Sequence, residues 1–174
     1  MFKKKAQAAL EFLTTYGWAF LVILVMIGAL SYFGVLSPDN YVPDSCNFGS
    51  VMSCYGGYAI SYDGANTTIK VDVSNIMPNS IKITSIKIKE KTASNYSTDL
   101  LDDATWSDSG DLKTDSLAAQ VSDTITIDTT EDIGASDYLN QKKTFLFDLM
   151  YTVGTSNISK LLKGSITTTV IDNS

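Results

Sequence analysis

The chain has 174 residues, carries a formal net charge of −6 at pH 7 and contains no histidine. The acidic balance argues against a nucleic-acid-binding protein, because such binding requires basic surface. The lack of histidine removes the commonest general base and the commonest metal ligand. The sequence contains no motif of a phosphate-binding loop, a serine hydrolase or a zinc protease. We therefore expect a protein that is not an enzyme and that uses neither a cofactor nor a metal.

Residues 1–6 read as a short basic leader, with lysines at Lys3, Lys4 and Lys5 followed by Ala6. A secretory signal peptide has its small-residue cleavage site after the apolar core, whereas here the small residue precedes the apolar stretch. Cleavage between Ala6 and Gln7 would keep that stretch as the start of the mature chain. The alternative is a single-pass anchor whose lysines stay on the cytoplasmic side.

Residues 7–36 are predicted to form one hydrophobic helix. No charged residue occurs from Phe12 to Leu36, and the run is long enough to span a bilayer. Gly17 and Gly28 are eleven residues apart, which places them on nearly the same face of a helix. Small residues on one face allow two helices to approach closely, so this pair is a candidate assembly surface.

Glu11 stands at the start of this apolar run. A buried, unpaired acid in a membrane segment is costly, although the cost falls toward the end of the helix. Lys5 lies six residues before Glu11, so no helical partner at the favourable spacing of four residues exists. A free amino group created at Gln7, in the same chain or a neighbour, would be a suitable partner. The alternative is an unpaired acid at the level of the lipid headgroups.

The order and spacing of these residues are similar to a known leader. The segment Lys5–Leu13, KAQAALEFL, resembles the class III signal peptide of archaeal type IV pilins. In one subset of that family Gln stands at the first mature position and Glu at the fifth, as Gln7 and Glu11 do here. The segment Tyr16–Ala19 and the apolar run after it also resemble this group, while Ala9 stands where the subset often has Ser.

The resemblance implies that a prepilin peptidase cleaves between Ala6 and Gln7. It also implies that the helix first holds the precursor in the membrane and then enters the core of an extracellular filament built from copies of the same chain. Glu11 would register each incoming subunit. The expected function is a structural pilin of an archaeal type IV pilus-like filament, used for adhesion. The alternative is a membrane-anchored cell-surface protein with an extracellular β-sandwich domain that never polymerises.

Residues 37–45 are predicted to be a linker, because Pro38 disfavours helix at the residue before it. Cys46 and Cys54 follow, eight residues apart. In an exported protein the default interpretation of such a pair is a disulfide, here fastening the start of the head. The alternative is two buried free thiols. Two cysteines without histidine do not make a structural zinc site.

Residues 46–174 are predicted to form an immunoglobulin-like β-sandwich head, so that the whole chain is α+β. Apolar and polar residues alternate at 69–73, 81–88, 125–127, 145–151 and 166–171, as half-buried strands require. The alternation slips by one residue at Thr84 and Ser85, which predicts a bulge or a bend. The run 145–151 is expected to be a central strand. Many short strands without an amphipathic helix between them favour a sandwich.

The segment Thr92–Gln120 is rich in Ser, Thr and Asp. Oxygen ligands suit calcium, but the spacing does not match an EF-hand, so we expect a solvated loop or an irregular edge, with Trp106 pinning it to the sandwich.

Three N-x-Ser/Thr triplets, at Asn66, Asn95 and Asn157, are candidate glycosylation sites on an exported head. The alternative is that they are unmodified loop residues.

Overall fold

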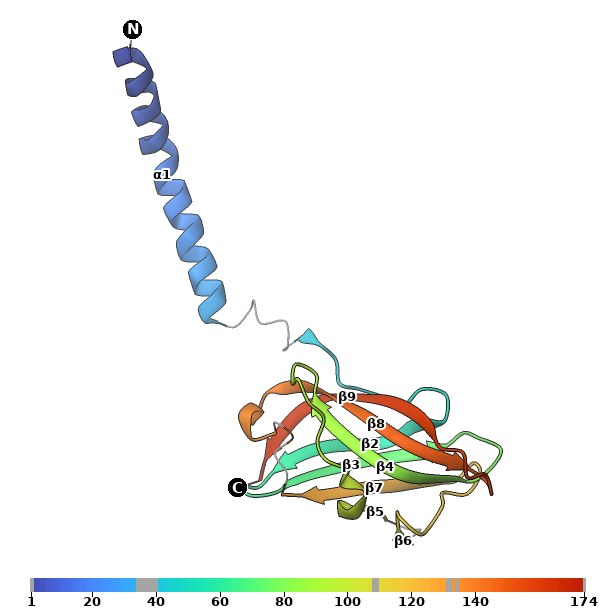
Figure 1. Cartoon of the computed structure of the whole chain (residues 1–174). Helices are drawn as coiled ribbons and strands as arrows, with labels where there is room; N and C mark the ends of the chain where they lie inside the picture. Colours follow the sequence, from blue (N-terminus) through green and yellow to red (C-terminus); the bar gives the residue numbers. More distant parts are fainter. Residues whose placement is uncertain (1, 34–40, 108–109, 131–132, 134, 174) are drawn as a thin grey trace. The chain divides into compact units, whose positions relative to one another are not determined.

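The computed structural model of the chain describes residues 2–33, 41–107, 110–130, 133 and 135–173. The chain forms two compact units that divide between Tyr41 and Val42. The first unit contains the helix, and the second contains the strands (Figure 1). The predicted order of one apolar N-terminal helix followed by a β-rich domain is confirmed.

Helix α1 spans Phe2–Tyr32, so it begins earlier than the predicted range 7–36. Residues 2–6 contain neither glycine nor proline, and nothing in their backbone chemistry stops the helix from extending toward the N-terminus. At the other end, the Phe33 backbone N–H donates to the Ala29 carbonyl oxygen at 3.0 Å. The end predicted at residue 36 lies outside the described residues.

The described part of the second unit contains nine strands and two short 3₁₀ helices. The strands are β1 (Ser45–Asn47), β2 (Met52–Tyr62), β3 (Thr67–Asn75), β4 (Ile81–Glu90), β5 (Ala104–Trp106), β6 (Gly110–Asp111), β7 (Ser122–Thr129), β8 (Lys142–Val153) and β9 (Lys160–Asp172), and the 3₁₀ helices are η2 (Leu100–Asp103) and η3 (Ser136–Tyr138). The strands form one sheet in the order β4-β8-β9-β2-β3-β7-β5-β6, and β1 pairs with β9 beside this path. The pair β2–β9 is parallel and covers only Ile60–Tyr62 against Val170–Asp172.

The sheet curls so that its two halves face each other across the core (Figure 1). One half, called here the β8 half, comprises β1, β4, β8 and β9, and the other, the β3 half, comprises β2, β3, β5, β6 and β7. A small apolar space of about 10 Å³ is lined from both halves by Phe48, Val71, Ile86, Ile125, Ile127, Phe147 and Leu149. A space of this size barely reaches the volume that one water molecule needs, so the halves pack closely.

The residues that face the core are those that the sequence alternation predicts. Alternate residues of β3 are buried, and so are Phe145, Phe147 and Leu149 on β8, which lies between β4 and β9 as a central strand. On β4 the pairing with β8 shifts between Ile83 and Ser85, so the isoleucines on both sides of the slip are buried. The predicted bulge is therefore confirmed.

Strands β1 and β2 lie outside the strands predicted from alternation. The pairing of β2 with β3 shifts between Cys54 and Tyr58. Two glycines lie inside this shift, and because glycine is uncommon in strands, the residue types there do not indicate a strand. A side chain at Gly56 would collide with the Asp72 side chain, so the irregular backbone requires glycine there. Ser45, predicted as linker, pairs with Thr167 in β1 instead. Residues 37–40 of the predicted linker lie outside the described residues.

The Ser- and Asp-rich segment after β4 covers the outer edge of that strand. The Ser97 hydroxyl and the Asp99 carboxylate each accept a backbone N–H of β4, from Ile88 and Ile86, at 2.9 Å. Leu117 forms a bridge to the first residue of the strand. These contacts occupy backbone groups at the edge of β4 that would otherwise be free to pair with a strand of another molecule. The segment is thus an irregular edge, and Trp106 within it is 3% exposed in β5, as predicted.

Candidate functional site

Most of the exposed large hydrophobic side chains among the described residues lie on the apolar segment of α1. Leu10–Tyr32 has a mean hydropathy of 2.0, and none of its most apolar window is buried. At 1.5 Å per residue, 23 residues extend about 35 Å, enough to cross a bilayer core. Length and composition thus make this segment a candidate membrane span. An apolar surface this large needs lipid or another protein to cover it.

Glu11 is the second residue of this segment, and its side chain is exposed. The hydroxyl of Thr15 donates to the Glu11 backbone carbonyl oxygen at 2.7 Å, and that of Thr14 donates to the Leu10 carbonyl oxygen at 3.0 Å. Both hydroxyls are therefore satisfied inside the helix. No hydrogen bond or ion pair from the side chains that the structure describes, which begin at Leu10, holds the Glu11 carboxylate. Ala6 and Gln7 lie on the same helix, and their side chains are outside the description.

Gly17 and Gly28 leave two open places on α1. A Cβ atom added at either position would meet no described atom within 4 Å. Since they are eleven residues apart in an unbroken helix, both lie on nearly one face. The arrangement allows a second helix to approach the backbone closely, and their role in assembly stays a prediction.

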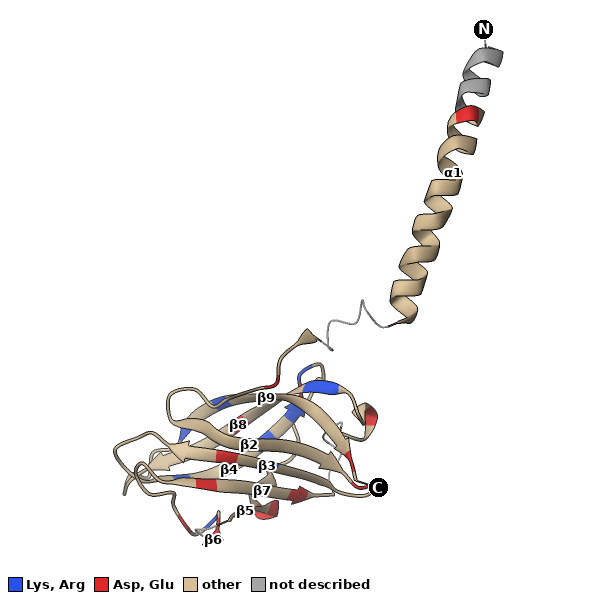
Figure 2. Cartoon of the chain, turned by 180° about the vertical axis from the view of Figure 1, so that it is seen from behind, with Lys and Arg blue, Asp and Glu red and all other residues tan. Residues whose placement is uncertain are grey.

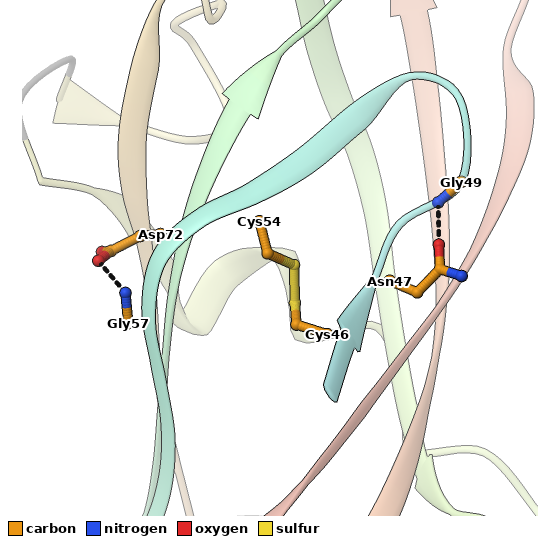
Figure 3. Close-up of a disulfide and its surroundings, with 6 residues drawn as sticks. All are labelled: Cys46, Asn47, Gly49, Cys54, Gly57 and Asp72. Atoms are coloured by element: carbon orange, nitrogen blue, oxygen red, sulfur yellow. Dashed lines mark hydrogen bonds between the residues drawn. A yellow bond between two sulfur atoms is a disulfide. The ribbon is translucent and has the colours of Figure 1, made fainter. Parts of the chain in front are cut away.

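Cys46 and Cys54 form a disulfide, as predicted (Figure 3). Cys46 belongs to β1, which pairs with β9, and Cys54 belongs to β2, which pairs with β3. The bond therefore joins the β8 half to the β3 half. Beside it, the Asp72 carboxylate accepts the Gly57 backbone N–H at 2.7 Å and so holds the irregular part of β2 (Figure 3).

Removing this disulfide is expected to destabilise the second unit without changing its fold. A closed loop of this length restricts the unfolded chain by about 2–3 kcal/mol, which corresponds to a fall in Tm of roughly 10 °C. Thermal unfolding followed by circular dichroism should give the same fall for the reduced protein and for the double variant Cys46→Ser with Cys54→Ser. An unchanged Tm in the reductant would contradict the stabilising role.

The three glycosylation triplets differ in accessibility. Asn95 and Asn157 are exposed. Asn66 is half-buried, and its backbone N–H and side-chain amide donate to the Asp63 carboxylate at 2.6 and 3.5 Å. The hydroxyl of Thr68, which completes that triplet, donates to Asp128 at 2.6 Å. The Ser97 hydroxyl of the Asn95 triplet is also hydrogen-bonded, since it accepts the Ile88 backbone N–H. What distinguishes Asn66 is that its own side-chain amide is half-buried and hydrogen-bonded.

Two acids of the segment 92–120, Asp99 and Asp111, accept backbone hydrogen bonds. Asp99 also caps η2 by accepting the Leu101 backbone N–H at 3.2 Å, and Asp111 accepts the Lys113 backbone N–H at 2.9 Å. No group of three or more acidic, cysteine or histidine side chains within the described ranges is arranged to hold a metal ion. The structural role of Asp99 was missed at the sequence level, although an aspartate just before Leu100–Asp103 fits a cap.

No family model matches this chain, and no curated protein shows significant similarity to it. The resemblance to archaeal pilins therefore depends on the N-terminal residues, above all on Gln7 and Glu11.

Proposed function

We propose that this chain is a structural subunit, a pilin, of an archaeal type IV pilus-like surface filament. A prepilin peptidase removes residues 1–6 by cutting between Ala6 and Gln7, while the apolar helix holds the precursor in the membrane. The mature helix then leaves the lipid and packs against the helices of other copies in the filament core. The second unit lies on the extracellular surface of the filament and serves adhesion.

The observation that carries this proposal is the uncovered apolar helix with one acid at its start. Leu10–Tyr32 is apolar and exposed, and the Glu11 carboxylate has no partner among the described side chains, which begin at Leu10. The second unit has its own core, so the helix is not needed to complete it. Burying apolar surface contributes about 25 cal/mol per Å². A helix that leaves the bilayer for a filament keeps that contribution.

The second unit suits a surface position. We propose that its two facing halves function as an immunoglobulin-like β-sandwich head, supported by the core that they share. We also propose that Asn95 and Asn157, both exposed, carry oligosaccharides, and that Asn66 does not. Such sugars would shield the filament surface.

N-terminal mass spectrometry on protein sheared from cells tests the function directly. The proposal predicts filaments whose subunits start at Gln7, with extra mass only on peptides that contain Asn95 or Asn157. A chain that keeps Met1 and is recovered only from membranes would instead favour the permanent anchor. The sequence pattern alone leaves that alternative open, because a span of this composition fits both roles.

A further inference from the structure

The strand charges of the second unit are separated between its two halves. Of the eight lysines in strands, seven lie on β4, β8 and β9, together with three acids (Figure 2). The strands of the β3 half contain four acids and one lysine, Lys70. One half of the sheet is thus basic and the other acidic, although the chain as a whole is acidic.

The outward surface of the β8 half combines lysines with apolar side chains. Lys87 on β4 pairs in register with Asp148 on β8, and Asp148 pairs with Lys163 on β9. Next to this row, Met150 on β8 stands opposite Leu161 on β9, which is 53% exposed. We call the surface formed by Lys87, Met150, Leu161 and Lys163 the lysine face. The face thus places an exposed apolar pair beside a row of charged residues, and protein interfaces likewise combine apolar and charged side chains.

The two lysines of this face lack a partner in the described residues. No described carboxylate lies within 4.0 Å of the Nζ atom of Lys87 or Lys163. Asp148, which lies between them, accepts the Tyr96 hydroxyl at 3.2 Å. Burial and the Asp148 charge raise the pKa of Tyr96, so the hydroxyl stays a donor at neutral pH. The lysine charges are therefore free to meet acids from outside.

A complementary surface lies on the same chain around η2 and β6. Helix η2 packs against β4 and β7, and β6 is the last strand in the sheet order. Asp102 forms an ion pair with Lys113. The hydrogen bond to Asp102 raises the pKa of Lys113, and the charges of Asp111 and Asp103 add to this effect. Three exposed carboxylates thus surround one exposed ammonium group. We call these four residues the acidic edge.

We propose that the lysine face of one copy docks on the acidic edge of a second copy, so that neighbouring heads join through unlike surfaces. Such a heterologous contact continues into an open polymer when the rotation between successive copies does not close a ring. The inference rests on the proposed filament, in which heads of neighbouring subunits come together. A second copy is favoured over an anionic lipid surface because the chain itself presents exposed carboxylates, those of the acidic edge, that are opposite in charge to the lysine face.

Zero-length carbodiimide cross-linking of the full chain in detergent tests the contact without requiring filaments. Equal amounts of ¹⁴N- and ¹⁵N-labelled protein are mixed, so that peptides joined between chains carry both isotopes. We expect mixed-isotope links from Lys87 or Lys163 to Asp102, Asp103 or Asp111. Mixed-isotope links confined to other residues, or none, would overturn the proposal. Links without filaments on cells would instead reject the proposed function and leave the docking intact.

Charge reversal measures the strength of the contact. The double variant Lys87→Glu with Lys163→Glu should lower the association constant, measured by sedimentation in detergent, about tenfold, because like charges then meet. Mixing it with Asp103→Lys plus Asp111→Lys should restore association. Lys70→Glu, an exposed lysine on the β3 half, is the matched control and should change nothing. Equal association of all variants would refute the charge contact.

Lysine acetylation in vesicles separates docking from lipid binding. With the full chain in phosphatidylcholine vesicles, we expect Lys87 and Lys163 to be protected from acetylation at high protein density and equally so after phosphatidylglycerol is added. Protection that needs phosphatidylglycerol, together with no links between chains, would overturn the proposal in favour of a membrane contact.

Discussion

Replacing Glu11 with alanine is expected to reduce the amount of filament on cells by about tenfold or more while the second unit stays folded. An acid at the start of an apolar segment costs about 1–3 kcal/mol unless it is paired, and each 1.4 kcal/mol changes an equilibrium constant tenfold. In the proposed filament the neighbour's free amino group supplies the pairing. Alanine removes the charge and with it the preference for one register. The measurement is the quantity of subunit in sheared material.

Two further variants show whether the charge at this position matters. Glu11→Gln keeps the size and the hydrogen-bonding capacity of the side chain but removes its charge, and it should fail almost as severely as alanine. Thr14→Ala, three residues away, removes a hydroxyl that is satisfied within the helix, and it should assemble normally. Thermal unfolding of the second unit should be the same for all three variants. Normal filaments from Glu11→Ala would reject the registry role.

Asn75→Ala is expected to cause the largest loss of stability among single changes in polar residues of the second unit. The Asn75 side chain is fully buried at the end of β3. Its amide donates to the carbonyl oxygens of Asn79, Leu117 and Ala118 at 2.9, 3.2 and 2.9 Å. Its carbonyl oxygen accepts the Met77 backbone N–H at 2.9 Å. One side chain thus ties together two loops that lie far apart in the sequence.

Alanine at this position leaves these backbone groups without a partner in the interior. A buried polar group that loses its partner typically lowers the free energy of unfolding by about 1–3 kcal/mol. Several groups lose their partner here, but some of them form hydrogen bonds with water instead, so the expected total loss is about 3 kcal/mol. Tm should fall by roughly 10 °C. Asn79→Ala is the matched control, because the Asn79 side chain is exposed and only its backbone serves Asn75. Equal Tm values for the two variants would show that the buried network contributes little.

Local patterns predicted much of this molecule, and each success has a local cause. An apolar run without charges forms one helix whatever surrounds it, because all of its backbone hydrogen bonds lie within the segment. Alternation located β3, β4, β7, β8 and β9, since a strand with one buried face repeats every two residues. The slip in β4 appeared in the pattern because one extra residue reverses the face of those that follow. The disulfide was predicted because two cysteines in an exported protein usually pair.

The missed elements depend on contacts between distant residues. Strand β2 has glycines where it departs from β3, and its backbone is held there by Asp72 of another strand. Strand β5 is three residues long and β6 is two residues long. Both lie in a segment rich in Ser, Thr and Asp, a composition that is typical of loops. Among the candidate sites, Ala6, Gln7 and Glu11 were identified from their order and spacing in the sequence. The accessibility of each glycosylation triplet could not be predicted in this way. Asn66 is occupied only because the turn brings Asp63 beside it.

By itself the sequence determined the apolar helix with its acid, the β-rich composition of the rest and the disulfide, because each follows from neighbouring residues. The tertiary structure alone decided that the sheet curls into two facing halves, that Asn75 joins two distant loops, and that lysines and acids gather on different halves. The physical reason is that strand order and register depend on pairings across many residues. Local periodicity shows which face of a strand is buried, but it does not show which strand lies beside it.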